Sequence, residues 1–219
     1  MEREIIRTDD GSSTIRLPQW DECYHSTFGA IQESYHVFIT NGLSLFKGNP
    51  VSILEIGFGT GLNTLVTFVE SKDFGPIDYV GIEAYPVSLD EVAQLNYPEQ
   101  LRDGQYRSVF EKMHHADWDT PIRISDDFKL TKRKLFFDQI DYSNQFDLIY
   151  FDAFGYNVQP ELWSVEIFTL MHNALKSNGI LVTYAARGIV KRNLQQVGFK
   201  VVKLPGPPGK REMMRAVKE

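Results

Sequence analysis

A glycine-rich segment joins a short apolar run to a helical pattern, and it constrains the fold of this chain more than any other feature. The run 51–56 is followed by Gly57-Phe-Gly-Thr-Gly61, and a helical pattern continues to about residue 71. Glycines at such a point allow a tight turn and a close approach of the backbone to a ligand, while the start of the helix offers unpaired N–H groups. The segment therefore predicts a ligand-binding loop between a strand and a helix.

Further short apolar runs alternate with helical stretches, which is typical of parallel βαβ units. The expected strands are 51–56, 77–83, 146–152 and 180–185, with a less regular one at 122–130, and the expected helices are 61–71, 86–96, 161–176 and 187–197. The segment 199–218 contains two strand-like runs joined by a Pro/Gly loop, so these two runs must pair antiparallel. A mostly parallel seven-stranded sheet with an antiparallel C-terminal hairpin predicts a class I, Rossmann-like methyltransferase fold of the α/β class.

The first 48 residues precede this pattern. A turn at Asp9-Asp-Gly-Ser12 between two β-branched runs predicts a hairpin, and apolar residues at helical spacing from Ile31 to Ile39 predict a helix that ends near Gly42. We therefore expect an N-terminal extension, residues 1–48, packed on a methyltransferase domain, residues 49–219.

The composition limits the class of protein further. The chain has 219 residues, 42% of them hydrophobic and 24% charged, which fits one globular domain rather than a disordered or fibrous chain. A single cysteine, Cys23, gives no disulfide and implies no metal site. Because no apolar run approaches the roughly 18 residues that span a bilayer, we expect a soluble cytoplasmic protein without a membrane partner.

The spacing of the glycines selects among cofactors. The pattern is G-x-G-x-G, whereas dinucleotide sites use G-x-G-x-x-G and ATP sites use G-x-x-x-x-G-K-[ST]. Glu55, just upstream, would repel a pyrophosphate but could hold the ammonium group of a methionine moiety. Glu83, about 20 residues past the last glycine, could accept hydrogen bonds from ribose hydroxyls. A turn without a ligand would explain the glycines but not Glu83, so the features together predict S-adenosylmethionine as the cofactor.

Asp152 ends the third clear strand, in Tyr150-Phe-Asp-Ala-Phe-Gly155. Ligands in open α/β sheets bind beyond the carboxyl ends of the strands, so this carboxylate should lie beside the glycine loop. The next expected helix starts too far away for Asp152 to cap it. A carboxylate beside a transferable methyl group suits a substrate amine, whose proton it could accept.

The charge is unevenly distributed along the chain. Residues 187–219 contain nine cations and two anions, a net charge of +7, whereas the whole chain carries -6 and residues 1–186 therefore carry -13. Such an asymmetry favours a local polyanion-binding face, although solvated basic faces on a helix and a strand would produce the same count.

These residues complete a resemblance to one family, the methyltransferase domain of the tRNA 5-methylaminomethyl-2-thiouridine biosynthesis protein, in a freestanding form. The shared motifs run along nearly the whole chain: Thr8-Asp-Asp-Gly-Ser12, Tyr24-His-Ser26, Gly29-Ala30, Glu33-Ser34, His36-Val-Phe38, Gly57-Phe-Gly-Thr-Gly-Leu-Asn63, Phe151-Asp-Ala-Phe154, Pro160-Glu-Leu-Trp163, Gly188-Ile-Val-Lys-Arg192 and Pro205-Gly-Pro-Pro-Gly-Lys-Arg-Glu-Met213. The glycine loop predicts only a methyltransferase, whereas the terminal motif and Tyr24-His-Ser26 narrow the family.

The resemblance implies methylation of the 5-aminomethyl group of the wobble uridine of tRNA, giving 5-methylaminomethyl-(2-thio)uridine. A separate oxidoreductase would supply the aminomethyl precursor. The residues assigned to S-adenosylmethionine are Glu55, Gly57, Phe58, Gly59, Thr60, Gly61, Asn63 and Glu83. Asp152 is the expected catalytic residue, and the residues assigned to the substrate or tRNA are Tyr24, His25, Phe154, Tyr156, Lys191, Arg192, Lys210 and Arg211.

Two departures and three alternatives accompany this assignment. The family usually reads Asp-Ala-Phe-Ala-Pro where this chain has Asp152-Ala-Phe-Gly-Tyr156-Asn157. Tyr156 either stacks on a base, which we slightly favour, or is a solvent-exposed loop residue. The acidic residue that binds adenine in some members has no match after the third strand, where the sequence places Thr131 or Lys132. A small-molecule amine N-methyltransferase or an aminopropyltransferase would share the site but leave the basic tail unexplained, and a non-catalytic scaffold would not need Glu83 or Asp152.

Overall fold

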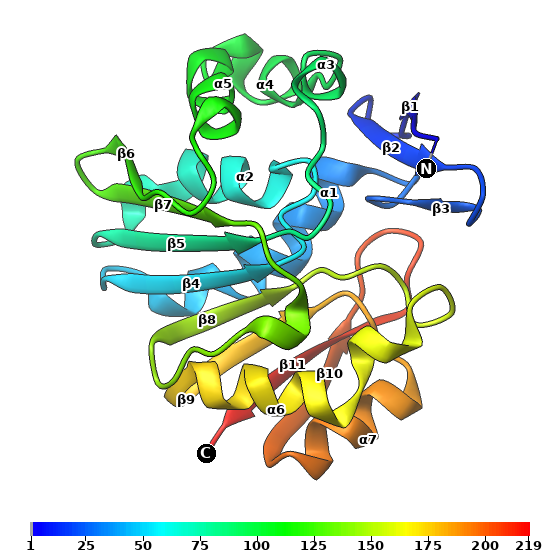
Figure 1. The fold of residues 1–219 in the computed structure, drawn as a ribbon, viewed down its shortest axis with the longest axis vertical. Coiled ribbons are helices and arrows are strands. Elements are labelled where there is room, and N and C mark those ends of the chain that lie inside the picture. Colours follow the sequence, from blue (N-terminus) through cyan, green and yellow to red (C-terminus); the bar gives the residue numbers. More distant parts are fainter. Residues whose placement is uncertain (1) are drawn as a thin grey trace.

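The computed structural model describes residues 2–219, which form an eight-stranded sheet with helices on both faces and a small N-terminal sheet (Figure 1). The strands are β1 Glu4–Arg7, β2 Ser13–Leu17, β3 Glu22–Cys23, β4 Val51–Ile56, β5 Ile77–Ile82, β6 Ile122–Ser125, β7 Phe128–Arg133, β8 Phe146–Phe151, β9 Leu175–Thr183, β10 Phe199–Pro205 and β11 Glu212–Lys218. The α-helices are α1 Ala30–Ser34, α2 Leu62–Glu70, α3 Leu89–Val92, α4 Tyr97–Gln100, α5 Arg107–His115, α6 Val165–Ala174 and α7 Gly188–Gln196. A π-helical turn at Tyr35–Thr40 follows α1, and short 3₁₀ turns lie at Leu43–Phe46, Ser71–Asp73, Arg102–Gly104, Phe137–Gln139 and Pro160–Trp163.

The strand order of the large sheet is β10-β11-β9-β8-β4-β5-β7-β6. Strands β4, β5, β7, β8 and β9 run parallel, and β11 lies antiparallel between β9 and β10. The predicted C-terminal hairpin and the predicted fold class are therefore confirmed. The sheet has eight strands rather than the expected seven, because β6 pairs antiparallel with β7 at the edge.

Two predicted elements are wrong in detail. The single strand expected over 122–130 is a hairpin, because Asp126 and Asp127 form a tight turn between β6 and β7, and aspartates favour turns. The helix expected over 86–96 is reduced to the four residues of α3, and Asn96 has a non-helical backbone. The Asn96 side chain binds Ser13 and Gly11 instead, so a tertiary contact to the N-terminal hairpin replaces the helix.

The sheet carries one hydrophobic core on each face. Successive residues of β4 point to opposite faces, so that Ile53 packs with α1, α2 and α5 whereas Leu54 packs with α6 and α7. Both layers are visible in Figure 1, where α6 and α7 cross in front of β9–β11. Parallel strands buried on both faces explain the nearly continuous apolar runs in the sequence.

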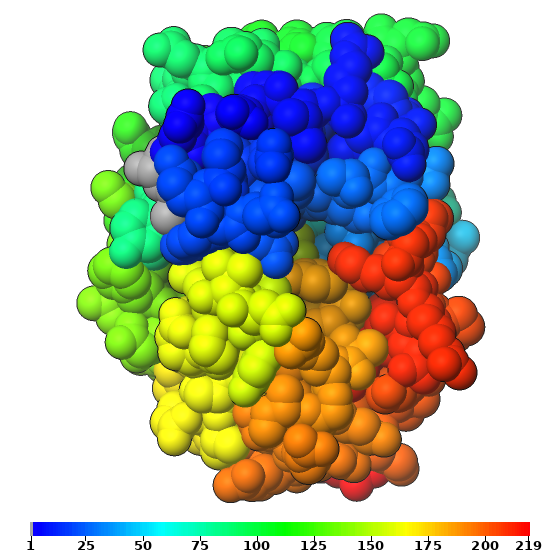
Figure 2. Space-filling view, turned by 90° about the vertical axis from the view of Figure 1, so that its right-hand side faces the viewer, coloured from blue at the N-terminus to red at the C-terminus, as the bar shows by residue number. Residues whose placement is uncertain are grey.

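The N-terminal residues pack onto this framework. The predicted hairpin is confirmed, with β1 and β2 antiparallel around Gly11, and Ile15 and Phe38 are buried in the same core as β4 and α2. Figure 2 views the side toward which the carboxyl ends of the parallel strands point, and the N-terminal segment, in blue, covers its upper half. The proposed division at residue 48 stays a prediction. Within residues 2–219, no helix is long and apolar enough to cross a membrane.

Candidate active site

The topology brings the glycine loop and Asp152 together. The chain leaves β4 toward β5 and β7 on one side and returns to β8 on the other, and this switch of direction creates a crevice at the carboxyl ends of β4 and β8. The Asp152 N–H donates to the Ile56 carbonyl at 2.9 Å. Gly57 has a φ of 88°, and a Cβ there would lie 2.7 Å from the Asp152 carbonyl oxygen, so the close approach requires glycine.

A cavity of about 1090 Å³ opens at this crevice. The segments that follow β4, β5 and β8 contribute Gly57, Gly59, Glu83 and Asp152 to the wall of this cavity. The segment 20–28 of the N-terminal extension and Lys210 of the β10–β11 loop complete it. Segments from both ends of the chain therefore enclose a site that the sheet positions, and Figure 2 shows the blue, yellow and red segments meeting on this side.

The Glu83 carboxylate is held in place by two backbone N–H groups. Its Oε2 accepts a hydrogen bond from the Gly59 N–H and its Oε1 from the Tyr85 N–H, both at 2.9 Å. Each oxygen keeps a further lone pair that can accept a hydroxyl proton. Because the Gly59 N–H is already used and a carboxylate lies beside it, this loop suits a ribose better than a phosphate.

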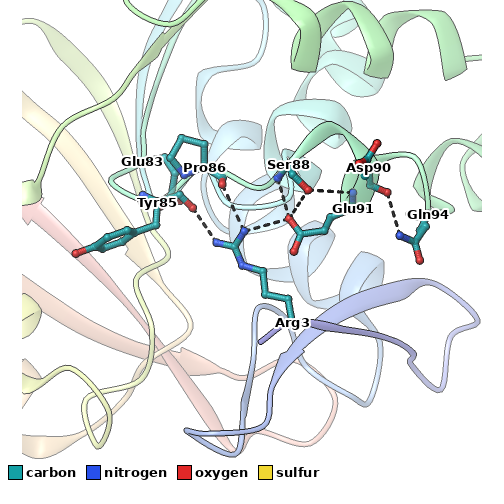
Figure 3. A network of polar contacts seen from close by, with 8 residues as sticks. All are labelled: Arg3, Glu83, Tyr85, Pro86, Ser88, Asp90, Glu91 and Gln94. Atoms are coloured by element: carbon teal, nitrogen blue, oxygen red, sulfur yellow. Dashed lines mark hydrogen bonds and ion pairs between the residues drawn. The ribbon is translucent and has the colours of Figure 1, made fainter. Parts of the chain in front are cut away.

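Arg3 fixes the segment that follows Glu83 (Figure 3). Its guanidinium donates to the carbonyls of Tyr85 at 2.9 Å and Pro86 at 3.4 Å, and it pairs with Glu91 at 3.1 Å. Glu91 also forms a capping box with Ser88 at the start of α3. The first residues of the chain therefore support the wall beside Glu83, a contribution that sequence patterns did not reveal.

Glu55 does not line the cavity, contrary to its expected contact with a cofactor ammonium. Its side chain is fully buried beneath the loop, where Oε2 accepts hydrogen bonds from Thr64 at 3.0 Å and Tyr79 at 2.9 Å. Among the described residues, no partner reaches Oε1. Burial raises the pKa of Glu55 to about 8, because its effect is larger than the opposing effect of the hydrogen bonds. Glu55 therefore belongs to the support of the loop.

Phe58 is also turned away from the cavity. It is 3% exposed and packs against Gly81, where a Cβ would meet its ring, and against Trp118 at 6.0 Å between ring centroids. Gly61 is the N-cap of α2, with a φ of 72°, and it does not line the cavity either. The expected direct contacts of these two residues with a cofactor are not supported by their placement.

Thr60 and His25 connect the N-terminal segment to the loop. Thr60 is fully buried, its Oγ1 lies 2.7 Å from His25 Nε2, and it accepts a hydrogen bond from Tyr97 at 3.2 Å. Burial lowers the pKa of His25 to about 4, so the ring is neutral and can accept the Thr60 hydroxyl proton. His25 therefore lines the cavity and also supports the glycine loop, whereas Thr60 contributes from behind.

Asp152 faces the cavity with one oxygen engaged. Its Oδ2 accepts a hydrogen bond from Asn63 Nδ2 at 2.8 Å. Burial and the negative charge of Glu33 raise the pKa of Asp152 to about 7, against the opposing effects of the Asn63 hydrogen bond and Lys210. A carboxyl group with this pKa can accept a proton near neutral pH.

Aromatic rings surround the part of the cavity next to Asp152. Phe154 lies edge-on to Tyr24 and to Trp20, with centroid distances of 5.0 and 5.8 Å. Tyr24 also packs on Gly59, where a Cβ would lie 3.1 Å from its ring. Four exposed aromatic side chains line this cavity, namely Trp20, Phe28, Tyr85 and Phe136. The site therefore presents flat apolar surfaces beside the carboxylate of Asp152.

The basic residues of the tail divide between two locations. Lys210, expected to bind phosphate, lies in the cavity wall, where it pairs with Glu33 and lies 3.9 Å from the centroid of the Tyr184 ring. Arg192 and Arg211 are exposed, and Lys191 is partly exposed, all outside the cavity lining.

Tyr156 lies outside the cavity lining too, which does not support its expected stacking on a base there. The Arg187 guanidinium lies 5.6 Å from the centroid of its ring, so Tyr156 contacts the residue that precedes α7 instead.

The cavity contains residues that the sequence did not assign to it. Glu33 and Tyr184 lie near Asp152, and Lys134, Phe136 and Phe137 follow β7, where the sequence predicts the adenine contact. The sequence pattern predicts Thr131 or Lys132 after this strand. Because β7 ends only at Arg133, the residues that follow it into the cavity are Lys134, Phe136 and Phe137 instead. Glu33 could have been noticed as part of a shared motif, but no local spacing links it to Asp152.

The fold and site define a methyltransferase. Residues 109–219 match the model of a family described as S-adenosyl-L-methionine-dependent methyltransferase. The chain belongs to this family, and the residues of the cavity fit its cofactor, since side-chain-free glycines and a backbone-anchored Glu83 line one wall.

The resemblance to the tRNA 5-methylaminomethyl-2-thiouridine biosynthesis family is confirmed by similarity along the chain. The bifunctional protein MnmC of Ralstonia nicotianae is 31% identical over 89% of this chain, and that of Leptospira interrogans is 28% identical over 90%. This chain covers 31% and 32% of those relatives, about a third of their length. The structure of MNMC2 from Aquifex aeolicus matches with a TM-score of 0.78 at 24% identity, over 98% of this chain and 70% of that one.

A spermidine synthase from Thermotoga maritima has a related fold, with a TM-score of 0.56 at 14% identity over 99% of this chain and 72% of that one. At these identities the structural matches establish the fold alone. The substrate must therefore be inferred from the residues that line the cavity.

Proposed function

We propose that this methyltransferase acts on the 5-aminomethyl group of the wobble uridine of tRNA and forms 5-methylaminomethyl-(2-thio)uridine. The observation that carries the proposal is the position of Asp152, which lies between the glycine loop and a set of aromatic rings. An amine attached to a flat base needs both a carboxylate for its nitrogen and an apolar surface for its ring. The relatives named for the biosynthesis of this nucleoside support the same substrate.

S-adenosylmethionine supplies an electrophilic methyl group when bound. Gly57 and Gly59 would contact it through the backbone, and Glu83 would accept hydrogen bonds from its ribose. Asp152 would hold the substrate amine and accept the proton that the nitrogen releases on methylation. Its pKa of about 7 allows both the charged and the protonated state near neutral pH.

The rings around Asp152 would exclude water and orient the base. Phe154 and Tyr24 contact each other edge-on, so the two rings hold each other in place at the cavity wall, where a base would pack against them. Trp20 and Phe28, at the exposed rim, would contact the neighbouring unpaired nucleotides. Exposed cations outside the cavity, including Arg192 and Arg211, would contact phosphates.

A tRNA substrate implies a cytoplasmic reaction and a supplier of the aminomethyl group. We propose that a separate oxidoreductase provides this precursor. A direct test is methyl transfer from labelled S-adenosylmethionine to bulk tRNA from a strain that lacks the protein, with putrescine and spermidine offered in parallel. Label in 5-methylaminomethyl-uridine derivatives supports the proposal. Methylation of the free amines but not of tRNA would refute it.

A further inference from the structure

Asn63 reaches Asp152 from behind the cavity. It lies in the first turn of α2, is 1% exposed and does not line the cavity, although the sequence assigned it to the cofactor. Its Nδ2 donates to Asp152 Oδ2 at 2.8 Å, and its Oδ1 accepts a hydrogen bond from Ser34 Oγ at 2.6 Å. Both ends of this buried amide therefore have a partner.

Ser34 fixes the direction in which this amide points. It is 1% exposed and belongs to α1, so its position is set by a helix of the N-terminal segment. A serine hydroxyl has one proton, and donating it to Asn63 Oδ1 leaves the amide NH₂ on the side of Asp152. An NH₂ group can only donate, which suits a carboxylate oxygen and keeps that oxygen turned toward α2.

We propose that Asn63, oriented by Ser34, is a positioning residue that engages Oδ2 of Asp152 and leaves Oδ1 for the substrate amine. The inference rests on the role of Asp152 in the proposed function, but it does not depend on the amine belonging to tRNA. It assigns to α1 and α2 a part in the reaction that is separate from cofactor binding.

Charged groups face Asp152 from several elements. Glu33 of α1 adds negative charge, and Lys210 of the β10–β11 loop adds positive charge. Glu55 of β4, whose pKa burial raises to about 8, is protonated near neutral pH and becomes a negative neighbour only above that range. Lys210 pairs with Glu33 and lies over Tyr184, whose hydroxyl donates to the Ala153 carbonyl at 2.8 Å. The backbone of Ala153, next to Asp152, is therefore held by Tyr184, independently of Asn63.

The hydrogen bond from Asn63 favours the charged form of Asp152, because the donor stabilises the carboxylate. Its removal should therefore raise the pKa of Asp152 further above its value of about 7. The second consequence is mechanical, since a carboxylate without this bond can rotate away from the substrate.

The test compares Asn63→Ala and Ser34→Ala with Thr67→Val, which removes a buried hydroxyl from the same helix without touching the Asp152 side chain. Isotope-edited NMR follows the carboxyl carbon of Asp152 with pH in the absence of substrate. We expect Asn63→Ala to raise this pKa by about one unit, Ser34→Ala to raise it less, and Thr67→Val to leave it unchanged. Affinity for S-adenosylhomocysteine should stay the same in all three variants.

The kinetic readout separates positioning from folding. Methyl transfer by Asn63→Ala should lose on the order of tenfold to a hundredfold in kcat, and its pH profile should move upward, with little change in cofactor KM. An unchanged Asp152 pKa, or a loss explained by weaker cofactor binding, would overturn the inference. If tRNA proves not to be the substrate, the NMR titration still decides the role of Asn63.

Discussion

Replacing Glu55 with glutamine should make the protein more stable at alkaline pH. Burial raises the pKa of this carboxyl group from 4.5 to about 8, so between those values the folded protein keeps a proton that the unfolded chain has released. The resulting stabilisation is complete below pH 4.5 and is lost as the pH rises to about 8. At ~1.4 kcal/mol for each pH unit, the free energy of unfolding falls by up to roughly 5 kcal/mol across the interval.

Glutamine reproduces the protonated form in shape and charge. Its carbonyl can keep the hydrogen bonds from Thr64 and Tyr79, so the substitution removes the titration without removing an acceptor. Urea unfolding from pH 5 to 9 should show stabilities of the two proteins that differ by less than about 1 kcal/mol at the acidic end. At pH 9, Glu55→Gln should be more stable by several kcal/mol.

Glu111→Gln, on the exposed surface of α5, is the matched control. Because this variant keeps Glu55, its stability should fall with pH as that of the wild type does. A stability difference that stays constant from pH 5 to 9 would refute the reasoning, as would a less stable Glu55→Gln at pH 9. The same variant tests the contact expected from the sequence. Affinity for S-adenosylmethionine should be unchanged, whereas a direct ion pair to the cofactor ammonium would give a loss of about tenfold or more.

Three further predictions concern the walls of the cavity and the basic face. Gly57→Ala should destabilise the fold by about 1–3 kcal/mol and weaken cofactor binding, because its Cβ would lie 2.7 Å from the Asp152 carbonyl oxygen. Calorimetry that finds the stability and the cofactor affinity unchanged would contradict this. Glu83→Ala should lower cofactor affinity on the order of tenfold while thermal stability stays close to wild type, and undiminished affinity would remove Glu83 from the ribose site. Arg192→Ala should reduce the slope of log affinity for tRNA against log salt concentration by about one unit. Lys210→Met should leave this slope unchanged, since Lys210 is paired with Glu33. Equal slopes for the two variants would contradict this difference.

Much of the fold could be predicted because parallel strands buried on both faces have a simple pattern. The runs that became β4, β5 and β8 are short, apolar and separated by helices, and the glycine loop marks the first crossover. The β6–β7 hairpin was missed since its turn, at Asp126 and Asp127, lies within a run that resembles one irregular strand.

The residues of the cavity could be predicted from the sequence only where they lie next to the end of a strand. Gly57, Glu83 and Asp152 follow strands directly, so the topology places them together. Ser34 and Asn63 meet through the packing of α1 on α2, and Lys210 meets Glu33 across 177 positions of the sequence. No local spacing encodes such contacts. Glu55 and Phe58 were assigned to the cofactor because a sequence does not show which side of a loop faces the ligand.

The role of Asp152 is tested most directly by Asp152→Asn, assayed with labelled S-adenosylmethionine and tRNA from a strain that lacks the protein. Asp78→Asn, at an exposed position on β5, is the control and should retain full activity. We predict that the wild type places label in 5-methylaminomethyl-uridine derivatives, and that Asp152→Asn binds the cofactor normally but loses most of this turnover. Undiminished turnover in Asp152→Asn, or no label in that nucleoside with the wild-type protein, would contradict the account.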